Sequence, residues 1–489
     1  MRNRKSIVLE PLISIITPYY NAEEYIEETA KSVLGQTFPL FEWIIVDDGS
    51  SEESLEKLKK VEKLDKRIKV IFSKTAKKEP TPNCENAKKE PTPNCENCKG
   101  PAVTRDIGIK SSAKASKYIV FLDADDLYDK TFLECAYWTL ETHPEASWTY
   151  TDTVNFGAKN FLWRKWYNVE WEKNENILTV AACVRKKDLL EVGGFELKEK
   201  KVYEDWYLWL KLIKAGKYPV RMNSLLTYYR QKEKNSELKT SNSTNKEKAM
   251  KIINNISREI AEYRDGIQFP KFDYNWEEIK DENESIPKLK RKKDDKIHVL
   301  MIIPWMVTGG ADRFNLDLVS KLDKSKYEFT IITVVPTNNE WRKKFEKYAI
   351  IYDLTTFLDM KDWVSFINSI IHKNNINLIF NSNSEFGYKV LPYLKAKHPK
   401  IPIVDYVHME EWYWRNGGFS RDSSSTANVL DKTFTCNENS KKEFVNHFGR
   451  KAREVKTVYV GVDETKFNPE SIKTDLAQNY PKGQKQNRY

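Results

Sequence analysis

The chain has 489 residues, which is too many for one hydrophobic core and indicates two or three domains. Its 81 basic and 71 acidic residues leave a net charge of +10, which fits a solvated surface, anionic substrates or an anionic lipid surface. A nucleic-acid partner is not expected, because no clustered basic face or known module appears. The longest apolar runs are shorter than the ~18–20 residues of a membrane-spanning helix, so we expect a cytoplasmic protein without a signal peptide.

Residues 11–231 alternate strand and helix signals, as expected for a parallel sheet with crossover helices. The apolar runs at 12–20, 41–46, 68–72 and 118–122 predict strands. Helices are predicted at 22–34, 54–64 and 101–115, and another begins near Glu204. This stretch is predicted to form the first domain, of α/β class.

An insertion interrupts this pattern, because AKKEPTPNCEN occurs twice in succession, at 76–86 and 87–97. Surface loops tolerate such added length at little entropic cost, so we assign it no function. Cys84, Cys95 and Cys98 lie in or beside the repeat, and the last two have metal-ligand spacing. A zinc site is disfavoured, because a fourth ligand is missing and no histidine is near.

Residues 232–296 change character and are predicted to form a linker, with one amphipathic helix at 245–264 and a charged stretch after it. A second α/β unit follows, which we place at 297–467. Its predicted strands are HVLMIIPW, FTIITVV, NLIFN, IPIVDYV, TFTC and TVYVG, and Thr308-Gly309-Gly310 opens a helix at 311–322.

Acidic residues follow a buried strand at Asp123-Ala124-Asp125. Open α/β sheets bind ligands at the carboxyl ends of their strands, and carboxylate oxygens suit Mg²⁺ or Mn²⁺ bridging to a diphosphate. The motif alone is weak evidence, because Asp126 also fits a plain helix-capping cluster.

Two further acidic groups stand at similar places. Asp47-Asp48-Gly49-Ser50 ends a strand, where a carboxylate can accept from a base or from ribose hydroxyls, although a β-turn explains the same residues. Glu204-Asp205 begins a helix, where the dipole favours a carboxylate. Asp205 would act as general base if an acceptor hydroxyl lay within hydrogen-bonding reach.

Taken in order, the motifs PYYNAEEYI, VDDGS, GPAVTRDIGI, FLDADD and VGGF with Glu204-Asp205 resemble glycosyltransferase family 2, over residues 11–231. The resemblance implies a GT-A fold, an inverting mechanism, a nucleotide-sugar donor and a divalent metal ion at a DXD motif. It implies Asp205 as catalytic base and Asp123 and Asp125 as metal ligands. The residues implied to bind the nucleotide sugar are Thr17, Pro18, Tyr20, Asp47, Arg105, Asp123 and Ala124.

Three features depart from the family pattern. Asp106 stands where the family has asparagine, the duplicated segment precedes Gly100, and no histidine between His143 and His298 could serve as a further metal ligand. The Gln-x-x-Arg-Trp segment of the processive synthases is missing near Arg230, which favours the addition of one sugar per encounter.

The second unit resembles the N-terminal lobe of glycosyltransferase family 4, which implies a Rossmann-like GT-B lobe. The resemblance rests on Gly309-Gly310-Ala311-Asp312-Arg313, Val407-His408 and the segment from Tyr459, with His408 implied as a substrate contact. Residues 468–489 would be a truncated tail between two lobes, because the second lobe is not in the sequence. Catalysis is therefore assigned to the first domain.

The sequence thus predicts a transferase that moves one sugar to a cell-surface polysaccharide or lipid-linked glycan. Such an acceptor is compatible with peripheral association of the protein with the cytoplasmic face of the membrane. A non-catalytic nucleotide- or sugar-binding scaffold is the main alternative, and the intact carboxylates Asp47, Asp123, Asp125 and Asp205 disfavour it. A nucleotidyltransferase is disfavoured because Pro18-Tyr19-Tyr20-Asn21 replaces the glycine-rich basic loop that it would need.

Overall fold

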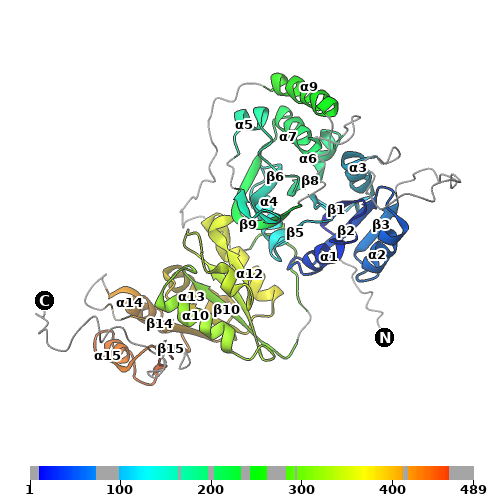
Figure 1. Cartoon of the computed structure of the whole chain (residues 1–489). Helices are drawn as coiled ribbons and strands as arrows, with labels where there is room; N and C mark the ends of the chain where they lie inside the picture. The colour runs from blue at the N-terminus through cyan, green and yellow to red at the C-terminus, as the bar shows by residue number, and fades with distance from the viewer. Residues whose placement is uncertain are drawn as a thin grey trace, which may run out of the picture. The chain divides into compact units, whose positions relative to one another are not determined.

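The structure is a computed structural model that describes residues 10–72, 99–163, 167–195, 203–232, 243–260, 282–291, 294–409, 411 and 417–461. The predictions for Cys84, Cys95 and Cys98, for the duplicated segment and for the tail lie outside these residues. The chain divides into two compact units (Figure 1). The first comprises 1–295, 329–338 and 346–376, and the second comprises 296–328, 339–345 and 377–489.

The first unit is built on a mixed sheet with the strand order β3-β2-β1-β4-β8-β6-β9-β5, and β7 pairs with β6. Strands β3, β2, β1 and β4 are parallel, as predicted, whereas β4 with β8 and β6 with β8 are antiparallel. The strands are β1 (Ile13–Tyr19), β2 (Phe41–Asp47), β3 (Ile68–Phe72), β4 (Tyr118–Phe121), β5 (Leu127–Tyr128), β6 (Trp148–Gly157), β7 (Phe161–Trp163), β8 (Ala182–Arg185) and β9 (Pro219–Gln231).

The helices of this unit that precede the second sheet follow the predicted alternation. They are α1 (Ile26–Leu34), α2 (Glu52–Glu62), α3 (Pro101–Ser111), α4 (Phe132–Thr142), α5 (Val169–Asn174), α6 (Lys186–Glu191), α7 (Glu204–Lys214) and α9 (Ser243–Glu259). Pro101 occupies the first turn of α3, where a missing N–H costs nothing, and Ser51 caps α2 by accepting from the Ser54 N–H.

Helix α9 belongs to the packed core, although its sequence lies in the stretch interpreted as a linker. Ile253, Ile256 and Ile260 are buried in one cluster with Trp148 of β6 and Trp209 of α7. Figure 1 shows α9 lying against α7. Burial of each isoleucine contributes roughly 1.5–3 kcal/mol, which is enough to fix a helix of this length on the unit.

The second sheet is parallel at every pairing described, with the order β12-β11-β10-β13-β14-β15-β16. Its strands are β10 (Ile297–Ile303), β11 (Tyr327–Thr333), β12 (Ala349–Asp353), β13 (Leu378–Ser382), β14 (Ile403–Val407), β15 (Lys432–Thr435) and β16 (Val455–Thr457). The helices between them are α10 (Gly310–Lys321), α11 (Arg342–Phe345), η2 (Leu354–Thr356), α12 (Met360–Lys373), α13 (Glu385–Lys397), α14 (Gly418–Ser425) and α15 (Glu438–Asn446).

The α/β class is confirmed for both units, and one predicted strand is displaced. TVYVG was expected as the last strand, but β16 ends at Thr457 and Tyr459 is 68% exposed. Val455 is buried instead, so the buried contact decides the strand and not the β-propensity of the later residues.

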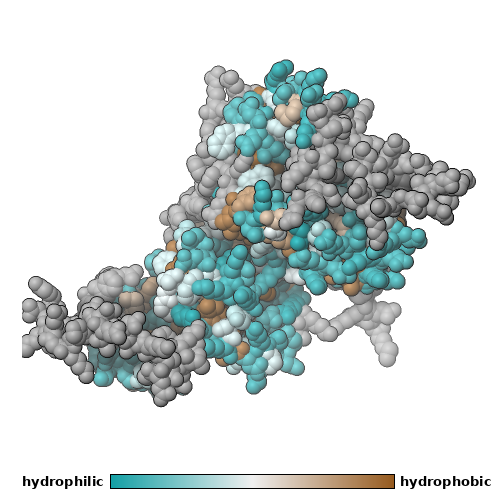
Figure 2. All heavy atoms as spheres, viewed as in Figure 1, coloured by the Kyte–Doolittle hydropathy of each residue, from teal (hydrophilic) through white to brown (hydrophobic). Residues whose placement is uncertain are grey.

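The described surface is mostly hydrophilic on the face seen in Figure 2, with apolar side chains in small separate groups. No described helix has both the length and the apolar character that crossing a bilayer requires.

Candidate active site

The carboxyl ends of β1, β2 and β4 lie side by side, because these parallel strands are in register. Asp47 ends β2 and is paired in register with Tyr19. Its carboxylate accepts from the N–H groups of Gly49 and Ser50, each at 3.1 Å, and Gly49 has a φ of 88°. Asp47 is therefore held by the turn that it caps, at the edge where ligands bind in such sheets.

The residues predicted to line the nucleotide pocket differ in exposure. Thr17 is fully buried, and its hydroxyl accepts from the Trp43 indole N–H at 2.8 Å. Tyr20 is 43% exposed, and Pro18 is partly exposed. Thr17 thus supports the end of β1, and Tyr20 is the member of this group with a side chain at the surface.

The DXD motif follows β4 and is anchored to α1. The Thr29 hydroxyl donates to the backbone oxygens of Ala124 and Asp126, at 2.9 and 3.0 Å. Asp126 is buried and accepts from the Arg230 N–H at 2.8 Å. Burial, together with the charges of Asp125 and Asp123, raises the pKa of Asp126 well above its usual range. The side chains of Asp123 and Asp125 are 29% and 23% exposed.

Arg105 joins the two acidic motifs. It lies on α3 with its side chain 3% exposed, and its guanidinium bonds Asp123 Oδ1 at 2.6 Å and Glu204 Oε1 at 2.7 Å. This bridge links Asp123 and Glu204, which are 81 positions apart in the sequence. Charge-assisted bonds in a buried setting are strong and directional, so the bridge fixes the start of α7 beside the DXD motif.

The Gly193-Gly194-Phe195 turn packs against Arg105 through the Phe195 ring. Gly194 has a φ of 67°, and a Cβ at this position would lie 2.4 Å from the Asp106 carboxylate. That carboxylate accepts from the Phe195 N–H at 2.9 Å, and the Phe195 ring lies 5.4 Å from the Arg105 guanidinium carbon. Asp106 thus acts as a hydrogen-bond acceptor here. The side-chain oxygen of an asparagine at this position would accept the same hydrogen bond.

Asp205 stands in the first turn of α7 and is partly buried. Its Oδ1 accepts from the Trp206 N–H at 2.8 Å and from the Asn176 amide at 3.1 Å. Burial, and secondly the charge of Glu204, raises the pKa of Asp205 to about 7. A carboxylate with this pKa holds and releases a proton near neutral pH, as a general base must.

Tyr229 on β9 is influenced electrostatically by both acidic groups. Burial raises its pKa, and the charges of Asp126, Asp123, Asp125 and Asp205 raise it further. The charges of the DXD motif and of Asp205 thus both act on the Tyr229 hydroxyl.

Two cations at the end of β9 face the DXD motif. Arg230 Nε donates to the Asp125 backbone oxygen at 2.8 Å, and Lys232 Nζ lies 2.5 Å from Asp125 Oδ2. The described residues contain no group of three or more histidine, cysteine or acidic side chains that would enclose a metal ion. The oxygen donors Asp123 and Asp125 do suit a divalent ion, provided that a diphosphate supplies further ligands.

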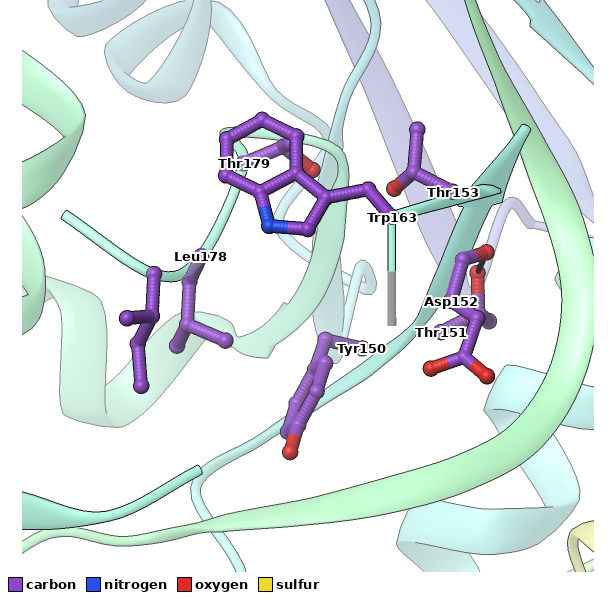
Figure 3. Close-up of a pocket in the computed structure, with 8 residues that line it drawn as sticks. Tyr150, Thr151, Asp152, Thr153, Trp163, Leu178 and Thr179 are labelled. Carbon is purple, nitrogen blue, oxygen red and sulfur yellow. Dashed lines mark hydrogen bonds between the residues drawn. The ribbon is translucent and has the colours of Figure 1, made fainter. Parts of the chain in front are cut away.

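Two cavities of the first unit lie away from these carboxylates. One, with about 10 Å³ of free space, is lined by Tyr150, Asp152 and Trp163 (Figure 3) and is too small for a sugar. The other measures about 400 Å³ and lies among Trp138, residues 286–290 and α12. None of the predicted site residues lines either cavity.

In the second unit, His408 follows β14 and lies 3.1 Å from the Ser382 hydroxyl, which donates to Asn315. Burial lowers the pKa of His408 to about 4, so its imidazole is neutral at physiological pH. Gly309 and Gly310 stand at the start of α10, as expected for a strand-to-helix loop.

Residues 14–79 match the family described as Glycosyl transferase family 2, and residues 308–466 match Glycosyltransferase Family 4. The chain belongs to glycosyltransferase family 2 through its first half, and its second half is similar to family 4 over the matched residues. It is a glycosyltransferase, with a mixed sheet in its first unit and a parallel second sheet.

Two of the curated relatives show the extent of the similarity. TuaG of Bacillus subtilis, assigned to teichuronic acid biosynthesis, is 32% identical over 257 residues, which cover 51% of this chain and 89% of TuaG. WfgD of Escherichia coli, named as a UDP-Glc:α-D-GlcNAc-diphosphoundecaprenol β-1,3-glucosyltransferase, is 29% identical over 223 residues, 42% of this chain and 70% of WfgD. The structure of Staphylococcus aureus TarS 1–349 with UDP-GlcNAc aligns at 19% identity, with a TM-score of 0.39, over 50% of this chain and 66% of that one.

The residues that connect the motifs were not predicted from the sequence. Glu204 was noted as part of a pair, but its bond to Arg105 was not foreseen, nor were the contacts of Asn176 and Lys232. Arg230 gave a weak signal, since it stands near the place of a family motif. Asn176, just after α5, and Lys232, just after β9, have no spacing that distinguishes them from ordinary loop residues.

Proposed function

We propose that this chain is an inverting, metal-dependent glycosyltransferase that moves one sugar from a nucleotide-diphosphate sugar to an acceptor hydroxyl. The observation that carries the proposal is the Arg105 bridge, which joins Asp123 of the DXD motif to Glu204, the neighbour of Asp205. A donor-side carboxylate and an acceptor-side base thereby belong to one site. The domain boundaries that we propose are 11–231 for this transferase and 297–467 for the second unit.

The donor would bind at the carboxyl ends of β1, β2 and β4. Asp47 would accept from the base, Tyr20 and Pro18 would flank it, and Asp123 would contact the ribose or the metal ion. Asp125 would hold Mg²⁺ or Mn²⁺ together with the diphosphate. When bound, the ion would neutralise charge on the leaving diphosphate.

The transfer step follows from the place of Asp205. Both of its described hydrogen bonds involve Oδ1, so Oδ2 is the oxygen that would take the proton of the acceptor hydroxyl. The acceptor oxygen bonds to the anomeric carbon as the bond from that carbon to the diphosphate breaks, and the diphosphate leaves from the opposite face. The anomeric configuration is inverted, and the proton stays on Asp205.

The acceptor that we propose is a hydroxyl of a cell-surface polysaccharide or a lipid-linked glycan. Support comes from the similarity to TuaG, which is assigned to teichuronic acid biosynthesis, and to WfgD, which is named for a diphosphoundecaprenol-linked sugar acceptor. A lipid-linked acceptor would bring the enzyme to the cytoplasmic face of a membrane.

The test is a panel of UDP-, GDP- and TDP-sugars with Mn²⁺ or Mg²⁺, followed by detection of nucleotide release. We expect slow hydrolysis of at least one donor, because water can replace the acceptor at Asp205. Absence of binding and of hydrolysis with every donor, for a protein that melts cooperatively, would favour the non-catalytic scaffold.

Asp125→Ala is expected to remove the metal dependence of nucleotide binding. The variant loses a hard oxygen ligand, so adding Mn²⁺ should no longer tighten binding of the matching nucleoside diphosphate. Calorimetric titrations with and without Mn²⁺ measure this directly. A variant that keeps the full metal effect would show that Asp125 is not a ligand.

Asn176→Ala is expected to move the pH dependence of transfer. The Asn176 amide stabilises ionised Asp205 and lowers its pKa, so its loss raises the pKa of Asp205 further above the usual range. The midpoint of kcat should shift to higher pH, with a roughly two- to tenfold loss of rate at pH 7. An unchanged midpoint would mean that Asn176 does not act through Asp205.

A further inference from the structure

The end of β9 places a lysine ammonium where a metal ion would contact the DXD motif. Lys232 is one residue past the strand, and its Nζ lies 2.5 Å from Asp125 Oδ2. The pair is partly accessible, since the side chains are 31% and 23% exposed. The Lys232 ammonium is thus already the counter-cation of the predicted metal ligand.

The neighbouring cation is held much more firmly. Arg230 donates to the Asp125 backbone oxygen, pairs with Glu28 at 2.5 Å, and lies between the rings of Tyr25 and Phe156, at 4.9 and 4.4 Å. The Lys232 ammonium nitrogen lies 4.8 Å from the centre of the Tyr25 ring. Four flexible methylenes let its ammonium move by several ångströms without any backbone change.

A divalent ion and this ammonium compete for one carboxylate oxygen. A metal ion would stand ~2.0–2.3 Å from Asp125, next to the position that Nζ occupies. Two cations at such a separation repel strongly in a partly buried site. The Lys232–Asp125 pair therefore opposes metal binding to the free protein.

The donor removes this conflict, because its diphosphate offers the displaced ammonium a new partner. Lysine is a common phosphate-binding residue, and charge-assisted bonds to phosphate oxygens would replace the one to Asp125. The metal ion gains ligands from the same diphosphate. The new partner for the Lys232 ammonium and the added ligands for the metal ion both favour binding of the ion and the donor together.

We propose that Lys232 is an internal counter-cation that keeps Asp125 from binding a divalent ion in the free enzyme and turns to the diphosphate when metal and donor bind together. This inference rests on the proposed role of Asp125 as metal ligand. It makes the two ligands cooperative, and such coupling is reciprocal, with typical factors of 5–150.

The test is a titration of Lys232→Met with Mn²⁺ in the absence of nucleotide. The paramagnetic resonance signal of free Mn²⁺ measures how much of the ion is bound. We expect the variant to bind Mn²⁺ about tenfold more tightly than the wild type. Without metal, the variant should bind UDP or GDP several-fold more weakly. The matched control is Lys69→Met, because Lys69 pairs with Glu42 at 2.6 Å on the outside of the sheet and should leave Mn²⁺ affinity unchanged.

Each outcome decides between the inference and the function on which it rests. Unchanged or weaker Mn²⁺ affinity in Lys232→Met, with wild-type protein that binds Mn²⁺ in the presence of nucleotide, overturns the role of Lys232 alone. Failure of the wild type to bind Mn²⁺ even with nucleotide overturns the metal assignment and the inference with it. Thermal melting of each variant confirms that folded proteins are compared.

Discussion

Asp205→Asn is expected to lower kcat by at least about 10²-fold while nucleotide affinity changes little. The substitution keeps the shape of the side chain and its acceptor oxygen, but removes the group that takes the proton of the acceptor. Asp205 holds a pKa of about 7, so wild-type activity should rise with pH through neutrality and level off above it. The variant should lose that dependence. Steady-state kinetics between pH 5.5 and 8.5 and a nucleotide titration measure both effects.

The control for this variant is Asp188→Asn, because Asp188 also stands in the first turn of a helix and pairs with Lys217 at 3.3 Å. It should leave kcat within about twofold of wild type. Loss of nucleotide binding in Asp205→Asn would contradict the assigned role, since Asp205 would then serve the donor and not the acceptor.

Arg105→Met is expected to destabilise the protein by about 3–5 kcal/mol, because it leaves the carboxylates of Asp123 and Glu204 without their shared buried cation. Methionine fills similar space, so the loss reports the charge and not a cavity. Nucleotide binding should weaken as well, since the DXD motif and the start of α7 lose their link. Urea unfolding and calorimetry give the two quantities.

Arg67→Met provides the comparison for Arg105. Arg67 pairs with Asp65 at 2.8 Å, but both side chains are about one quarter exposed, so its loss should cost ~0–1 kcal/mol. An equal loss in the free energy of unfolding for Arg67→Met and Arg105→Met would contradict a structural bridge at Arg105. If Arg105 contacted only the nucleotide, Arg105→Met would weaken nucleotide binding without lowering the stability of the protein.

The order of elements was predictable because most buried strands of these sheets are continuous apolar runs. Strand β3 and the start of α3 fall at the predicted residues, and β1, β2 and β4 are within two residues. The antiparallel half of the first sheet was not foreseen, since pairing direction depends on how distant segments pack. Strand β12 was also missed, because AIIYD is too short to stand out from its surroundings.

The acidic residues of the site were predictable from strand ends and helix starts, and the relations among them were not. Sequence places Asp123 and Asp205 on separate elements, and only packing shows that Arg105 connects them through Glu204. The pKa of Asp205 likewise depends on its burial, on the charge of Glu204 and on the Asn176 hydrogen bond, and sequence spacing does not reveal that burial or that bond. Roles for Thr17, Asp47 and Asp125 remain predictions that ligand-bound structures would test.

The most direct measurement is a crystal structure of the protein with Mn²⁺ and the nucleoside diphosphate that the donor panel selects. The account predicts the nucleotide at the carboxyl ends of β1, β2 and β4, with its base near Asp47, its diphosphate near Asp125 and Lys232, and Asp205 facing the acceptor side. A nucleotide bound instead at Gly309 and Gly310 of the second unit, with the DXD motif still paired to Lys232, would contradict the assignment of catalysis to the first domain.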